Sequence, residues 1–204
     1  MRLLTTLLAF LLLSFTSAEA KNPIEGIIYL KDGQTLTYAD NNKMLAPEYM
    51  NNITVYKNYG KDNQEKSDIN ANDVDSMICW SATNSDVQYV FRYFPNNGWY
   101  WEYMNFDHIM VLVYSYKGYD DEFFNAKSGK SLSVLKNKGS FFLWRPDRKQ
   151  LKPLGDANKK ATNTFIEKIC EYISDDQETC HHFDYCYNTK REDVLKLLIS
   201  FQPK

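Results

Sequence analysis

The chain has 204 residues, a formal net charge of −2, 25% charged residues and 44% hydrophobic residues. These values are typical of an ordinary globular protein, and they exclude a disordered tail, a collagen and a multi-span membrane protein. They also remove the electrostatic case for a nucleic-acid binder, which needs a strongly basic surface. The unusual feature is the aromatic content, with fifteen Tyr, twelve Phe and four Trp.

The first 20 residues have the pattern of a secretory signal peptide. Arg2 stands beside the free amino terminus, residues 3–15 carry no charge, and residues 18–20 supply the small-x-small motif Ala-Glu-Ala. This order predicts cleavage before Lys21 and export of the mature chain. A membrane anchor is the alternative, but thirteen helical residues rise only about 20 Å, short of the roughly 30 Å hydrocarbon core. We expect no transmembrane span once the signal is removed.

Residues 21–155 show the alternating apolar pattern of β-strands and are predicted to form one antiparallel β domain. A polar stretch, residues 60–72, is predicted to be an exposed loop. So many short strands favour an antiparallel β-sandwich or a partly open barrel over a fold that alternates strands and helices. The predicted strands cover residues 24–30, 34–38, 53–59, 73–80, 87–94, 99–104, 109–116, 131–136 and 140–145.

After this β domain the apolar residues recur with helical spacing. One helix is predicted from near residue 157 to residue 173, and a second over residues 177–183. A third is predicted to follow a capping box formed by Thr189 and Glu192. Residues 156–204 are therefore expected to be C-terminal helices that pack on the β domain, which makes the fold class α+β.

The central hairpin, residues 87–104, is aromatic on both faces. An even-numbered turn would place four candidate binding residues on one face, namely Arg92, Trp99, Trp101 and Tyr103. An odd-numbered turn would exchange the faces of the second strand. If exposed, these side chains would form a platform for sugar rings or for a protein partner, with a cation–π contact from the arginine. The alternative is that one face is buried in the core. For the other face, we expect the C-terminal helices rather than a ligand or a partner to cover it.

All four cysteines lie in the predicted mature chain. Neighbouring cysteines can pair in an oxidising compartment, so Cys170–Cys180 and Cys180–Cys186 are both candidate disulfides. Buried free thiols, which behave as small hydrophobic side chains, are the alternative for these residues and for Cys79.

A metal site is suggested by a short segment that holds Cys180, His181, His182, Asp184 and Cys186. Zinc ligands normally come in pairs at wider spacing, and adjacent histidines on a helix point about 100° apart. A helix end with two exposed histidines is the simpler interpretation. We therefore predict no metal and no cofactor.

Hydrolysis is suggested by Asp120, Asp121 and Glu122, because paired carboxylates can cleave glycosidic bonds. Adjacent carboxylates on a polar turn are more often solvated loop residues. The residue types of Cys79 and His108 would also allow a nucleophile and a base, but no catalytic sequence motif is present. We therefore predict no catalytic residue.

Basic residues gather where the predicted strands give way to the predicted helices. They would suit contact with anionic envelope material, and a solvated junction is the alternative. Asp147 and Asp156 lie among them, and the basic residues are Arg145, Arg148, Lys149, Lys152, Lys159 and Lys160.

Three features are similar to those of uncharacterised exported proteins of Gram-negative anaerobes. They are the sequence Leu-Lys-Asp-Gly-Gln-Thr-Leu at residues 30–36, the Trp- and Tyr-rich middle, and residues 165–175. The chain departs from that set at Cys180, where its members have leucine, and at residues 200–201, where they have Tyr-Asn. The resemblance implies export and brings no catalytic motif.

These features together predict a secreted or periplasmic, non-catalytic protein with a binding or structural role in the cell envelope. Its partner is expected to be a protein or a carbohydrate. The alternatives are a hydrolase that acts on a glycan and a carbohydrate-binding module with an aromatic platform.

Overall fold

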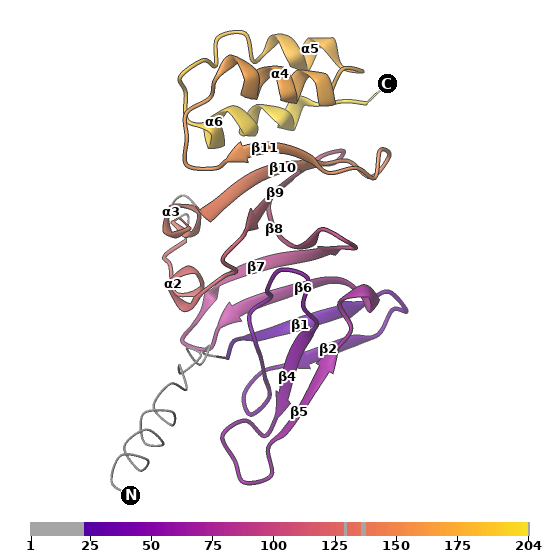
Figure 1. The fold of residues 1–204 in the computed structure, drawn as a ribbon, viewed down its shortest axis with the longest axis vertical. Coiled ribbons are helices and arrows are strands. Elements are labelled where there is room, and N and C mark those ends of the chain that lie inside the picture. The colour runs from indigo at the N-terminus through magenta and orange to yellow at the C-terminus, as the bar shows by residue number, and fades with distance from the viewer. Residues whose placement is uncertain (1–22, 129, 136–137, 204) are drawn as a thin grey trace, which may run out of the picture.

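The computed structural model describes residues 23–128, 130–135 and 138–203, and the predicted signal peptide lies outside these ranges. An eight-stranded antiparallel sheet and a three-stranded sheet form the β part, and short helices follow near the C-terminus (Figure 1). The predicted α+β class is confirmed. Within the described ranges, no helix combines the length and the apolar composition that crossing a membrane requires.

The larger sheet is a meander from β6 to β11, to which the N-terminal hairpin is added beside β6. Its hairpins follow the predicted order, but β11 falls where no strand was expected. In sheet order the strands are β11 (Lys152–Asp156), β10 (Gly139–Trp144), β9 (Met110–Ser115), β8 (Gly98–Asn105), β7 (Asn84–Phe94), β6 (Val74–Ser81), β1 (Glu25–Leu30) and β2 (Thr35–Tyr38).

The smaller sheet holds β3 (Lys43–Met44), β4 (Ile53–Lys57) and β5 (Glu65–Ile69), and a 3-10 turn, η1 (Ala71–Asp73), leads into β6. It packs closely on β1: a Cβ at Gly26 would lie 2.9 Å from Sδ of the fully buried Met44, so only glycine leaves room there. The prediction of a loop over residues 60–72 is wrong for β5, which pairs with β4 along its length. Its charged side chains still face solvent, which suits an edge strand.

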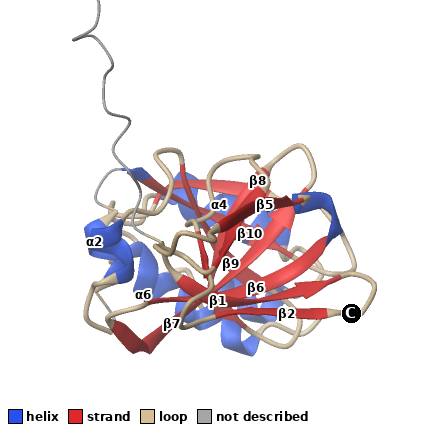
Figure 2. Cartoon of the chain, turned by 90° about the horizontal axis from the view of Figure 1, so that it is seen from below, coloured by secondary structure: helices blue, strands red, loops and turns tan. Residues whose placement is uncertain are grey.

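Two single-turn helices, α2 (Asp121–Phe124) and α3 (Ser131–Val134), lie at one side of the larger sheet (Figures 1 and 2). The prediction of a strand over residues 131–136 is wrong for residues 131–135, and residue 136 lies outside the described residues. Leu132 and Leu135 are three residues apart and both buried, and helical spacing brings such a pair to the same side of the backbone. The next strand, β10, pairs with β9 and β11 instead.

The C-terminal helices are α4 (Asn163–Tyr172), α5 (Gln177–His181), α6 (Arg191–Leu195) and the 3-10 helix η3 (Lys196–Ser200). They stack beyond β11 at one end of the molecule (Figure 1). The first begins later than predicted because β11 continues to Asp156 and Thr162 caps the helix by accepting from the Phe165 N–H at 3.2 Å. The predicted Thr189 capping box is wrong, since Lys190 is the N-cap of α6 and makes no side-chain capping bond.

A disulfide joins Cys170 of α4 to Cys180 of α5, with an S–S distance of 2.07 Å. This is one of the two pairings that the sequence leaves open. Cys79 and Cys186 are free thiols, the first buried and the second half-buried. The bridge therefore ties the first two C-terminal helices together.

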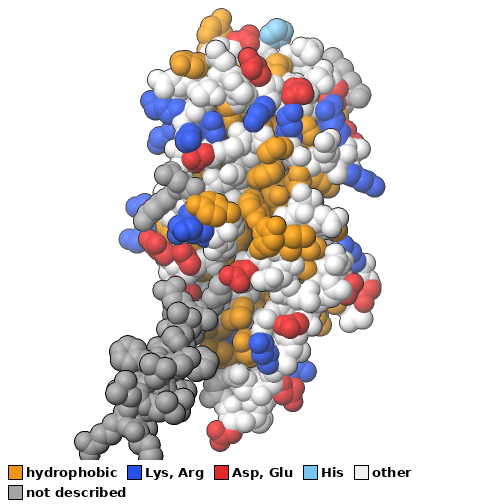
Figure 3. All heavy atoms as spheres, in the orientation of Figure 1, with side chains coloured by type: hydrophobic (Ala, Val, Ile, Leu, Met, Phe, Trp, Pro, Cys, Tyr) orange, Lys and Arg blue, Asp and Glu red, His pale blue; other side chains and the backbone are white. Residues whose placement is uncertain are grey.

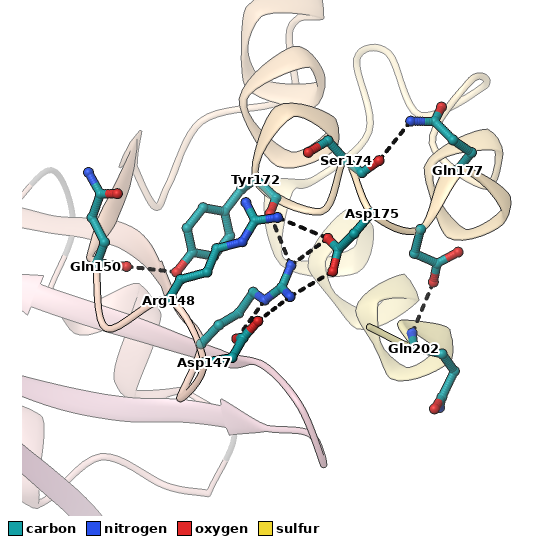
Figure 4. Close-up of polar contacts among 10 residues, drawn as sticks. Asp147, Arg148, Gln150, Tyr172, Ser174, Asp175, Gln177 and Gln202 are labelled. Carbon is teal, nitrogen blue, oxygen red and sulfur yellow. Dashed lines mark hydrogen bonds and ion pairs between the residues drawn. The ribbon is translucent and has the colours of Figure 1, made fainter. Parts of the chain in front are cut away.

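A buried arginine holds the helices to the end of β10. Arg145 is 1% exposed, and its guanidinium donates to both carboxylate oxygens of Asp175, at 2.6 and 2.7 Å, and to Asp147. It also donates to the Tyr172 carbonyl oxygen and lies 4.7 Å from the ring centre of Phe201. Figure 4 shows the polar partners Asp147, Tyr172 and Asp175 converging from the loop after β10 and from the C-terminal helices.

Three further basic residues of this junction pair with carboxylates. Arg148 donates to Asp175, Lys152 donates to Glu171, and Lys159 lies 3.7 Å from Asp156. The junction is therefore held by ion pairs rather than presented as one continuous basic surface.

Candidate binding face

The turn of the central hairpin decides which side chains share a face. Phe91 pairs with Trp101, and Phe94 pairs with Gly98, so three residues form the turn. Gly98 has φ of +95°, and a Cβ there would lie 2.4 Å from the Tyr49 carbonyl oxygen, which explains the glycine. Because the turn has an odd number of residues, the expectation of an even number is wrong. Each side chain of the second strand therefore lies on the face of the sheet opposite to the one expected.

Arg92 consequently does not lie with the two tryptophans. It pairs across the strands with Tyr100 and lies on the other face of the sheet, where Nε donates to Oε2 of Glu102 at 2.6 Å. The predicted cation–π platform is therefore not formed.

Trp99 and Trp101 are core residues, 1% and 8% exposed. The indole N–H of Trp99 donates to the Asn51 carbonyl oxygen at 3.0 Å. Trp101 packs between α2 and the neighbouring strands, with ring centres 5.1 Å from Phe123 and 5.7 Å from Tyr89. These contacts fill the interior, and they correct the expectation of an exposed tryptophan surface.

Tyr103 is half-buried on the same face as the tryptophans and lies beside α6. Burial, followed by the nearby Glu192 carboxylate, raises the pKa of its hydroxyl. The C-terminal helices thus reach the tryptophan side of the hairpin, whereas we had expected them on the second side.

The second side carries a different group of aromatic residues, which we call the outer aromatic cluster. Hydrophobic side chains gather over β7 to β10 in the middle of the view in Figure 3. Ring contacts link the members of the cluster into one continuous group. They are Tyr49, Phe94, Tyr100, Tyr114, Phe142 and Trp144.

Strand register positions this cluster. Phe142 lies opposite Leu112, and Trp144 lies opposite Met110, so side chains of β9 and β10 rise on one face. Leu112 is fully buried beneath them, yet it lies outside the main hydrophobic core. Tyr49 joins the cluster from the loop before β4, and its carbonyl oxygen accepts from the Trp99 N–H at 2.9 Å.

The cluster is open to solvent at its rim and closed at its centre. Tyr49 is 59% exposed, and Phe94, Tyr114 and Trp144 are half-buried. Tyr100 at the centre is only 3% exposed, and burial, with a smaller contribution from Tyr114, raises its pKa to about 12. The surface is therefore apolar and uncharged at neutral pH except for the neighbouring Arg92–Glu102 pair.

The rings of the cluster do not lie in one plane. The angles between ring planes are 85° for Phe94 and Tyr100, 83° for Tyr100 and Phe142, and 61° for Phe94 and Trp144. Edge-to-face packing of this kind is the favoured geometry of neighbouring aromatic rings. It produces a contoured apolar surface rather than a flat platform.

The residues that were considered for metal binding make other contacts. Cys180 is in the disulfide, and Nδ1 of His181 and Nδ1 of His182 lie 3.4 Å from Asp184 and 3.2 Å from Ser200. Across the described part of the chain, no group of three or more His, Cys, Asp or Glu side chains is arranged to hold a metal ion.

The residues that were considered for catalysis include a helix cap and a buried thiol. Asp120 is the N-cap of α2, accepts from the Phe123 N–H at 3.0 Å, and has a side chain 58% exposed. Cys79 is fully buried, which raises the pKa of its thiol, whereas His108 is exposed. Since the thiolate is the nucleophile, this cysteine is not activated.

Sequence reasoning missed the outer aromatic cluster because its members come from four strands and a loop. Alternation within residues 140–145 would have placed Phe142 and Trp144 on one face, which is the signal that was present. No protein-family model, no curated protein and no solved structure matches this chain.

Proposed function

We propose that this chain is an exported, non-catalytic binding protein of the cell envelope, and that the outer aromatic cluster is its contact surface for another protein. The observation that carries the proposal is a contiguous, part-exposed aromatic surface on a sheet face outside the main core. A contiguous exposed apolar surface often marks an interaction site, whereas single exposed apolar residues are common on protein surfaces.

The ring geometry favours a protein partner over a sugar. A sugar ring stacks on the flat face of an aromatic ring, so a platform for several sugars needs coplanar rings. The rings here are tilted by 42° to 85°, and such a contoured surface suits the side chains of a protein interface, where aromatic residues are enriched.

Export is supported by the signal-like pattern of residues 1–20 and by the Cys170–Cys180 disulfide, a bond that oxidising compartments maintain. The exported protein is expected to begin at Lys21, because the small-x-small motif ends at Ala20. Intact-mass measurement of the protein recovered outside the cytoplasm checks this. A mass that retains Met1 would contradict it.

Trp144→Ala is expected to weaken binding of the mature protein to envelope vesicles of the producing cell at least tenfold, because tryptophan is among the residues that carry most of an interface's binding energy. Binding is measured by co-sedimentation over a range of vesicle concentrations. Tyr185→Ala is the matched control, since Tyr185 is 95% exposed and lies outside the cluster. Unchanged melting temperatures would show that both variants are folded.

Treatment of the vesicles identifies the class of partner. A protein partner predicts that protease abolishes binding and that periodate oxidation of sugars leaves it intact. Binding that survives protease and is lost after periodate would overturn the proposal in favour of the carbohydrate-binding module. Equal binding by Trp144→Ala and Tyr185→Ala would remove the outer aromatic cluster from the contact surface.

A further inference from the structure

A cavity of about 220 Å³ lies away from the outer aromatic cluster, lined by residues of α3, of the segment after β11 and of the start of α6. A backbone bridge between Lys160 and Lys190 joins the last two of these segments, so the walls of the cavity are fixed to one another. Three of its lining side chains are cationic, namely Lys159, Lys190 and Arg191.

Arg191 is the unusual member of this group. It is 8% exposed, its Nε donates to the Lys160 carbonyl oxygen at 3.2 Å, and its Nη1 donates to the Asp156 carbonyl oxygen at 2.7 Å. Its guanidinium lies 4.5 Å from the ring centre of Phe165. Among the described residues no ion pair to Arg191 is formed within 4 Å, so its guanidinium contacts carbonyl oxygens and a ring, with the Asp156 carboxylate acting on it from further away.

The acidic residues near the cavity are already engaged. Asp156 accepts from the Asn158 N–H at 2.9 Å and lies 3.7 Å from Lys159. Glu192, which also lines the cavity, lies 3.8 Å from Lys196 and beside the Tyr103 hydroxyl. A buried charge is stabilised by a counter-ion, and these carboxylates do not supply one to Arg191 within contact distance. Among the residues that line the cavity, three cations stand against the single carboxylate of Glu192, while Asp156 and Asp193 act on the cations from beyond the lining.

The neutral lining of the cavity narrows the class of ligand. Asn158 and Ser133 line it beside the cations and bring an amide and a hydroxyl. Amide and hydroxyl groups bind the hydroxyls of a polyol, whereas the cations bind an acidic group.

We propose that this cavity binds a small hydroxylated organic acid, a sugar acid or a sugar phosphate, with its anionic group beside Arg191 and Lys190. The oxyanion is the chemistry shared by both ligands. The uncharged remainder of the molecule lies toward Asn158 and Ser133.

Isothermal titration calorimetry of the mature protein at low salt, with glucuronate, glucose 6-phosphate, inorganic phosphate and glucose, tests the proposal. We expect binding of at least one of the two acids, none of glucose, and weakening by added NaCl. Saturable binding of glucuronate but not of glucose 6-phosphate identifies a carboxylate site. Saturable binding of glucose 6-phosphate but not of glucuronate identifies a phosphate site. The proposal would be overturned if inorganic phosphate bound as tightly as glucose 6-phosphate. It would also be overturned if neither glucuronate nor glucose 6-phosphate bound.

Variants separate this site from general surface charge. Lys190→Gln is expected to weaken binding about tenfold, since it removes one charge-assisted contact while leaving the bonds of Arg191 in place. Lys66→Gln, on the exposed strand β5, is the matched control and should bind as the parent protein does. Equal affinities of the two variants, both with parental melting temperatures, would refute the assignment to this cavity.

Discussion

Arg145→Ala is expected to lower the free energy of unfolding by about 3–5 kcal/mol, because it removes a buried guanidinium together with its network of ion pairs and hydrogen bonds. The substitution would leave the Tyr172 carbonyl oxygen without this donor and Asp175 with the more exposed Arg148 as its ionic partner, and it would open a space beside Phe201. For a chain of this length the melting temperature should fall by about 10 °C. Thermal and urea unfolding of the mature protein measure both quantities.

Arg148→Ala is the control, since Arg148 shares Asp175 but has a side chain 33% exposed, and exposed pairs contribute about 1 kcal/mol or less. Similar losses from the two arginines would contradict a special role for the buried one. The pH profile gives a second check. The Arg145 guanidinium lowers the pKa of Asp175, so this contribution to stability is present at neutral pH and disappears as acid protonates the carboxylate. Arg145→Ala should lose that part of the acid dependence.

Phe123→Ala is expected to cost about 3–5 kcal/mol, the range for truncating a fully buried phenylalanine. Its ring lies 4.5 Å from Tyr89, 5.0 Å from Tyr119 and 5.1 Å from Trp101, measured between ring centres. Loss of this ring removes the cover that α2 places over the tryptophan side of the hairpin. Urea unfolding followed by tryptophan fluorescence measures the effect.

Phe123→Leu should cost clearly less, because it keeps most of the apolar volume. Tyr116→Ala changes an aromatic residue that is 61% exposed and should alter stability by less than about 1 kcal/mol. If Phe123→Ala were as mild as Tyr116→Ala, α2 would not be part of the cooperative core.

Much of the fold could be predicted because it depends on local patterns. Alternation and turn residues locate the N-terminal hairpin and the central hairpin, and helical spacing locates α4. The single-turn helix over Leu132 and Leu135 was missed because a five-residue segment with apolar residues at 132, 134 and 135 fits either period. The choice between helix and strand for this segment depends on the surface against which it packs, and that surface is formed by distant parts of the chain.

The candidate site was harder to predict because it depends on parity and on strand order. One extra turn residue before Gly98 would move every side chain of β8 to the opposite face of the sheet. The turn packs at Gly98 against the loop that holds Tyr49, which is distant in sequence. The disulfide partner of Cys180 likewise depends on how α4 and α5 meet. Such long-range contacts leave no local signal in the sequence.

The position of β1 in the larger sheet has a consequence for the order of folding. Strands β6 to β10 each pair with the next strand along the chain, and apart from the connection between β9 and β10, which holds α2 and α3, the loops that close these pairings are short. β1 pairs with β2 next to it and also with the more distant β6, where Gly26 faces Cys79. Closing a longer loop costs more entropy and slows pairing. The N-terminal hairpin therefore gains its final neighbour only after β6 has been synthesised, and until then the second edge of β1 has no strand beside it.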